Sequence, residues 1–102
     1  RRMENAIDRE HLDAATFGDR ALRSEVLRLF QAQVRILTAA IRDANGKPRM
    51  DAAHTLKGAA RGIGAFALAD AAEAIGRGDE AALAQLETLA MQASKDAEAL
   101  AS

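Results

Sequence analysis

The chain has 102 residues, enough for one domain with a single core, and its 14 lysines and arginines nearly balance its 15 aspartates and glutamates. That balance argues against a broad basic surface for nucleic acid, and the absence of cysteine excludes disulfides and thiolate metal sites. No apolar run approaches the roughly 20 residues that span a bilayer, and no signal-peptide pattern opens the chain. We therefore expect a cytoplasmic protein that binds neither nucleic acid nor membrane.

The composition favours helix throughout. Alanine is abundant, whereas the sequence holds one proline, no tryptophan, no tyrosine and few β-branched residues. No internal repeat or long linker divides the chain, so we treat residues 1–102 as a single domain and set residues 1–5 aside from the fold. Four or five helices account for most of the sequence.

A short helix is predicted first. Asp8 is a suitable N-cap, and Ile7 and Leu12 have the spacing of a hydrophobic staple. This helix ends near Ala15. Asp19 can cap the next helix, which ends before residue 45 and carries apolar residues at intervals of three and four: Leu22, Val26, Leu29, Phe30, Val34, Leu37 and Ile41.

A turn follows at Asn45 and Gly46. Pro48 suits the first position of a third helix, and Asp51 is favourable near the positive end of its dipole. The third helix is predicted to end around residues 62–64, and a fourth to cover residues 65–75.

Asp79 then caps a last helix that runs to about residue 100. Two seven-residue series lie along it: Leu83, Ala90 and Ala97, and Leu86, Ala93 and Leu100. Such apolar series on helices joined by short loops predict an all-α protein, an antiparallel up-down four-helix bundle with the short N-terminal helix across one end.

His54 stands out on the third helix. At about 100° per residue, the apolar positions Ala53, Leu56, Ala60 and Ile63 share one side of this helix, and His54 lies on the opposite side. Lys57, Gly58 and Arg61 follow His54 at three, four and seven residues and share its stripe. An imidazole is largely neutral at pH 7 and can act as a nucleophile, and a neighbouring lysine can bind a phosphoryl group carried on the ring.

The sequence here resembles the histidine-containing phosphotransfer (HPt) domains of bacterial two-component phosphorelays. The resemblance rests on an H-x-x-K-G-x-small-x-x-aliphatic-G-small pattern, which is formed by His54, Lys57, Gly58, Ala60, Ile63, Gly64 and Ala65. It extends over nearly the whole chain, including Phe30 in the long helix, Leu68 in the fourth and the Gly-Asp pair before the last.

The resemblance implies an antiparallel four-helix bundle with His54 as the phosphoacceptor. Phosphate would arrive from the aspartate of one response-regulator receiver domain, such as that of a hybrid sensor kinase, and pass to another. Lys57 would help to hold the phosphoryl group, and Gly58 would leave room for the receiver. From charge alone, Arg61 is expected to contact the acidic pocket of the receiver. HPt domains often place a polar residue on the fourth helix opposite the histidine. Here the candidates are Glu73 and Arg77, and neither is assigned that role.

The expected chemistry needs no cofactor on this chain. The sequence has no phosphate-binding loop for ATP and no carboxylate cluster beside His54, so Mg²⁺ would belong to the receiver. We expect a monomer with no kinase or hydrolase activity of its own.

Three other functions stay open at this point. The chain could be an adaptor bundle that binds a signalling partner without carrying phosphate. It could also be a metal or hydrolytic enzyme that uses both histidines, although His11 has no ligand motif around it. The third alternative is the histidine-bearing dimerisation region of a sensor kinase, which is normally followed by an ATP-binding domain.

Overall fold

The computed structural model describes residues 6–101; residues 1–5, which we set aside above, and residue 102 lie outside this range. The described residues contain no strand. Their helices, in chain order, are α1 (Arg9–Ala15), α2 (Arg20–Asp43), α3 (Gly46–Ile63), α4 (Phe66–Gly76) and α5 (Leu83–Ala101), with a short 3₁₀ turn, η1 (Glu80–Ala82), before α5.

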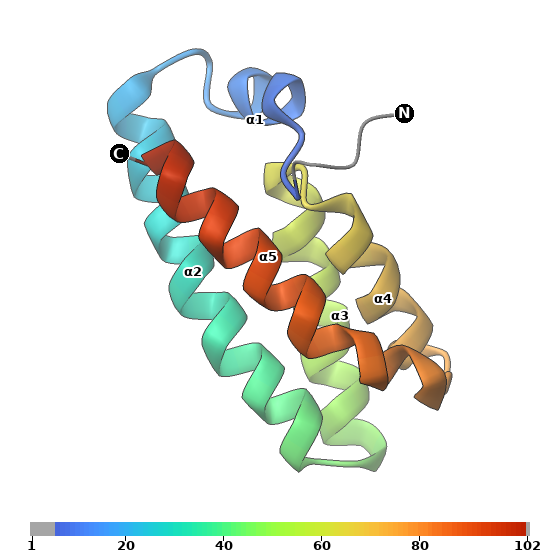
Figure 1. Cartoon of the computed structure of the whole chain (residues 1–102). Coiled ribbons are helices and arrows are strands. Elements are labelled where there is room, and N and C mark those ends of the chain that lie inside the picture. Colours follow the sequence, from blue (N-terminus) through green and yellow to red (C-terminus); the bar gives the residue numbers. More distant parts are fainter. Residues whose placement is uncertain (1–5, 102) are drawn as a thin grey trace.

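Helices α2 to α5 form an antiparallel bundle, and α1 lies across one end of it (Figure 1). Around the bundle, α2 packs against α3 and α5, and α4 packs against the same two helices. The predicted all-α bundle is therefore confirmed. Among residues 6–101, no helix is both long and apolar enough to cross a membrane.

The predicted N-caps of α1 and α2 are confirmed. The Asp8 carboxylate accepts a hydrogen bond from the backbone N–H of His11, and that of Asp19 accepts one from Leu22. Each cap satisfies a backbone donor that the first helical turn leaves free. Asp79 also accepts a backbone hydrogen bond, from Ala81, but the helix it caps opens as the 3₁₀ turn η1 before α5 begins.

The start of α3 differs from the prediction. Helix α3 begins at Gly46, so Pro48 is its third residue and not its first. The position still lies in the first turn, where a proline loses no intrahelical hydrogen bond. Gly46 has φ = 63°, a backbone conformation that favours glycine and reverses the chain between α2 and α3.

The buried side of α2 is also shifted from the predicted stripe. Leu29 is 61% exposed, whereas Leu27, which lies outside that stripe, is fully buried. Leu22, Val26 and Leu37 are half-buried at the edge of the core. The side of α2 that the bundle covers is therefore centred on Leu27, Phe30, Val34, Thr38 and Ile41.

Alanines let α3 and α4 pack closely. Ala53 and Ala60 on α3 and Ala69 and Ala72 on α4 are completely buried, and their small side chains allow the two backbones to approach. Larger side chains fill the remaining space, among them Phe30, Leu56, Leu68 and Leu86. Burial of each large aliphatic side chain contributes roughly 1.5–3 kcal/mol.

The two residues that precede α1, Ile7 and Asp8, fix this helix to the end of the bundle through backbone N–H groups. The Ile7 N–H donates to the Asp96 carboxylate of α5 at 2.9 Å, and the Asp8 N–H donates to the Gly64 carbonyl at 2.9 Å. Ile7 and Leu12, the predicted staple pair, are both buried in the core. The turn between α3 and α4 therefore has a defined position relative to α1.

Candidate functional site

Helix α3 presents His54 on its outer face. Ala53, Leu56, Ala60 and Ile63 are buried against the bundle, as the sequence predicts, and His54 on the opposite side is exposed. The rotation of the helix follows from that burial, because all four apolar residues lie within one face of an α-helix. An exposed imidazole on a convex helix face can meet a second protein without an opening of the fold.

One turn from His54, no side chain of residues 6–101 covers the backbone of α3. Gly58, one turn further along α3, is exposed, and a Cβ added there would meet no other heavy atom within 4 Å. Gly62, one more turn along, has the same open surroundings. Packing inside the monomer therefore does not require a glycine at either position, although glycine costs about 1 kcal/mol relative to alanine inside a helix.

The two predicted cations differ in their surroundings. Lys57 is half-buried, not exposed as its position on the His54 stripe suggests. Within residues 6–101, Lys57 takes part in none of the ion pairs. Arg61, by contrast, is bound to two carboxylates of α4: its guanidinium lies 2.9 Å from Glu73 and 3.9 Å from Asp70.

Glu73 and Arg77, the fourth-helix candidates, are joined to each other. The guanidinium of Arg77, the C-cap of α4, lies 3.4 Å from the Glu73 carboxylate, four residues earlier. Glu73 therefore bridges Arg61 on α3 and the C-cap of its own helix. Sequence reasoning missed this bridge, since it depends on the rotation and register of α4.

Two exposed apolar residues of α2 were also missed. Ile36 is 64% exposed and Leu29 61% exposed, and they lie two turns apart on one side of α2. Helices α2 and α3 are antiparallel, and Ile36 and His54 are each nine residues from Asn45 in the turn, so they are level along the bundle. The same count places Leu29 level with Arg61. Leu29 belongs to the predicted apolar stripe and Ile36 does not, so no spacing in the sequence marks the two residues as an exposed pair.

His11 lies in a different region. Its ring packs edge-on against Phe66 at the start of α4, with 5.1 Å between ring centroids. His54 lies nine residues before the end of α3, which corresponds to roughly 14 Å along the helix axis. The two histidines therefore do not share one site, and residues 6–101 contain no group of three or more histidine, aspartate and glutamate side chains arranged to hold a metal ion.

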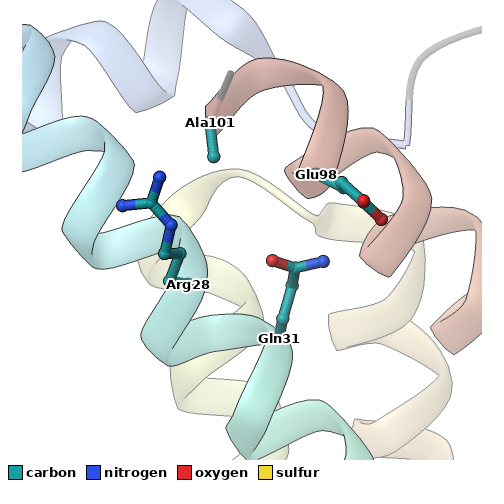
Figure 2. Close-up of a pocket in the computed structure, with 4 residues that line it drawn as sticks. All are labelled: Arg28, Gln31, Glu98 and Ala101. Atoms are coloured by element: carbon teal, nitrogen blue, oxygen red, sulfur yellow. The ribbon is translucent and has the colours of Figure 1, made fainter.

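A cavity of about 360 Å³ lies on another part of the bundle, between α2 and α5 (Figure 2). Arg28 and Gln31 of α2 and Glu98 and Ala101 of α5 line it. The Gln31 amide is held by the Ser94 carbonyl at 3.1 Å. None of the four predicted site residues lines this cavity, which is therefore separate from the exposed face of α3 that carries His54.

No protein-family model matches the chain, and no curated protein sequence matches it. Among solved structures, the chain is similar to histidine phosphotransferase ShpA from Caulobacter crescentus, with a TM-score of 0.82 and 37% sequence identity. The match covers 95% of this chain and 91% of that one. Fold, length and sequence thus agree over nearly the whole domain, and the chain belongs to the family of histidine-containing phosphotransfer domains.

Proposed function

We propose that the protein carries a phosphoryl group on His54 between receiver domains of a two-component phosphorelay. The observation that carries this proposal is the exposed imidazole on the outer face of α3, in a chain that is similar to a histidine phosphotransferase over almost its full length. One receiver domain, such as that of a hybrid sensor kinase, donates the phosphoryl group, and the aspartate of a second receiver accepts it.

The transfer step needs little covalent chemistry from this chain. The lone pair of one His54 ring nitrogen forms a bond to phosphorus while the bond from phosphorus to the aspartyl oxygen breaks, and the aspartate leaves as a carboxylate with that electron pair. The ring then carries a positive charge beside the phosphoryl dianion. Onward transfer reverses these bond changes with the second aspartate. Such reactions depend on in-line positioning and on charge stabilisation.

Lys57 is the residue we assign to charge stabilisation. It follows His54 by three residues on α3, so the two side chains are neighbours on the helix surface. The described part of the chain gives its ammonium group no ion pair, so the group is available to the phosphoryl oxygens. A charge-assisted hydrogen bond from it would stabilise the phosphorylated imidazole.

The docking face for the receiver consists of bare backbone and apolar side chains. Gly58 leaves space beside His54, and Ile36 and Leu29 supply exposed apolar surface on the neighbouring helix α2. Exposed apolar groups next to a reactive side chain mark a surface for another protein. Arg61 adds positive charge that favours the acidic pocket of a receiver.

The remaining requirements belong to the partner. The receiver would provide the acidic pocket and its Mg²⁺, and this chain would act as a monomer in the cytoplasm. The chain would thus be a carrier with no kinase activity of its own.

The test is phosphotransfer from isolated receiver domains. The chain is incubated with aspartyl-phosphorylated receivers, and phosphate that is stable to base but labile to acid is measured on it. We expect phosphate on the wild type and on His11→Gln, and none on His54→Gln. Binding of the receiver without any transfer of phosphate would instead identify an adaptor, and phosphate retained by His54→Gln would disprove the assignment of His54.

A further inference from the structure

Four charged side chains form a cluster of ion pairs between α3 and α4: Arg61, Asp70, Glu73 and Arg77. The Glu73 carboxylate lies 2.9 Å from the Arg61 guanidinium through one oxygen and 3.4 Å from the Arg77 guanidinium through the other. Both oxygens of Glu73 are thus paired with cations, one from α3 and one from the C-cap of α4.

The antiparallel register places the backbone of Glu73 near the level of His54. Glu73 and Leu56 each lie eight residues from the turn formed by Gly64 and Ala65, so Glu73 is level with a residue between His54 and Lys57. Arg61 is only three residues from that turn. Helical side chains lean toward the N-terminus of their helix, so Arg61 leans toward His54, Glu73 leans toward the turn, and their ion pair lies between the two levels.

Arg77 approaches the same carboxylate from the opposite direction. It is the C-cap of α4, four residues beyond Glu73, and leans back toward the N-terminal end of that helix. Arg61 and Arg77 therefore bring their guanidinium groups together at Glu73.

The ion pairs of this cluster are weak enough to exchange partners. The Arg61 side chain is 46% exposed, that of Glu73 38% and that of Arg77 68%, and ion pairs as accessible as these add little stability in water. A phosphoryl dianion offers more negative charge and more acceptor oxygens than one carboxylate, so it competes well for a guanidinium.

We infer that Glu73 is a positioning residue that controls the two arginines. While the imidazole is free, Glu73 holds Arg61 and Arg77 against α4. Once His54 carries phosphate, the phosphoryl group and Glu73 share the two cations, so that the phosphohistidine is stabilised but still able to pass its phosphate on. This inference rests on the proposed function of His54.

The test uses a small phosphoryl donor, so that it does not depend on a receiver. Phosphoramidate phosphorylates an imidazole when the ring nitrogen forms a bond to phosphorus and ammonia leaves with the electrons of the broken P–N bond. The decay of the phosphohistidine is then followed by ³¹P NMR. Glu73→Gln removes the ion pair of Arg77 with Glu73 and leaves Arg61 only its longer contact with Asp70 at 3.9 Å. We therefore expect a lifetime roughly two- to fivefold longer, the size of effect that a surface ion pair can produce.

Matched variants separate this mechanism from a general change in charge. Asp13→Asn alters the net charge equally and breaks the ion pair of Asp13 with Arg23 at 3.2 Å. Arg23 lies 13 residues further from the turn at Asn45 than His54 does, roughly 20 Å along the bundle, so we expect a wild-type lifetime for Asp13→Asn. In Arg61→Gln the lifetime should shorten, and adding Arg61→Gln to Glu73→Gln should remove most of the gain.

The outcomes distinguish this inference from the proposed function. A chain that takes phosphate on His54, with the same lifetime in wild type and Glu73→Gln, overturns the role of Glu73 and leaves the carrier function standing. An equal increase in Asp13→Asn also overturns it, because net charge would then explain the effect. A chain that carries no phosphate on His54 from either phosphoramidate or a receiver overturns both.

Discussion

Lys57 and Arg61 are both cations on the His54 stripe, but their surroundings give them different tasks. Arg61 is held by carboxylates of α4, whereas Lys57 is half-buried and outside the ion pairs of residues 6–101. A half-buried ammonium keeps its charge close to the surface of α3 and loses less side-chain entropy when it binds a phosphoryl oxygen. Lys57 is therefore the cation best suited to act directly on the transferred group.

Replacement of this lysine should affect chemistry and not folding. In Lys57→Ala we expect the transfer rate or the phosphohistidine lifetime to fall roughly tenfold, the effect of about one lost charge-assisted hydrogen bond. The thermal unfolding midpoint should stay near that of the wild type, since no ion pair is removed. Rates and melting curves are compared with those of Arg35→Ala, which removes an exposed cation from α2. If both variants transfer at the wild-type rate, Lys57 has no part in the reaction.

At this scale, the identity and exposure of His54 could be predicted from its own helix. One side of α3 is apolar at the right spacing, so the opposite side had to face solvent. The ion pairs of Arg61 could not be predicted. They depend on how far α4 is shifted and rotated against α3, which is set by the Gly64 turn and by the packing of alanines in both helices.

At the scale of the element, Gly64 determines how α3 ends. Its φ of 91° closes the helix in the left-handed conformation, and its carbonyl accepts the Asp8 N–H that fixes α1. A Cβ at this position would lie 2.9 Å from the Asp8 carbonyl oxygen. Backbone conformation and close approach therefore both require glycine here.

Alanine substitutions at two glycines of one motif should have opposite effects. Gly64→Ala should lower the free energy of unfolding by at least about 1–2 kcal/mol, because a side chain strains the left-handed backbone and meets Asp8. Gly62→Ala, in the open last turn of α3, should raise it by about 0.5–1 kcal/mol through helix propensity. Urea denaturation followed by circular dichroism measures both. Equal stability of the two variants would show that the Gly64 turn adjusts to a side chain at no cost.

The sequence predicts helix boundaries better than it predicts which side of a helix is covered. Asp8 and Asp19 have the chemistry of N-caps, which acts locally and needs no tertiary structure. The predicted apolar stripe of α2 does not coincide with the side that its neighbours cover: Leu29 belongs to the stripe and is exposed, whereas Leu27 lies outside it and is buried. The covered side depends on how α2 packs against α3 and α5, so spacing alone could not show it.

At the scale of the whole molecule, the core and the proposed site lie on different surfaces of the same helices. The buried faces of α2 and α3 hold the bundle together, while their exposed faces present His54, Gly58 and Ile36. The site therefore adds little to folding, and a partner can approach without disturbing the core. This separation makes it possible to block transfer in a protein that is fully folded.

Gly58 provides the sharpest test of that separation. The space beyond it is open, so Gly58→Ala should gain about 0.5–1 kcal/mol of stability and Gly58→Gln should melt near or above the wild type. The longer Gln side chain, one turn from His54, would stand between the imidazole and an incoming aspartyl phosphate. A displacement of about 1 Å can slow such a positioned reaction on the order of a hundredfold. We therefore expect Gly58→Gln to accept phosphate from a receiver far more slowly, while small phosphoramidate still phosphorylates His54 at a rate close to that of the wild type.

Gly62→Gln, one turn further from the imidazole, is the control for bulk on the same face. A Gly58→Gln variant that unfolds, or that accepts phosphate from the receiver at the wild-type rate, would show that access of the partner is not the reason for glycine at this position.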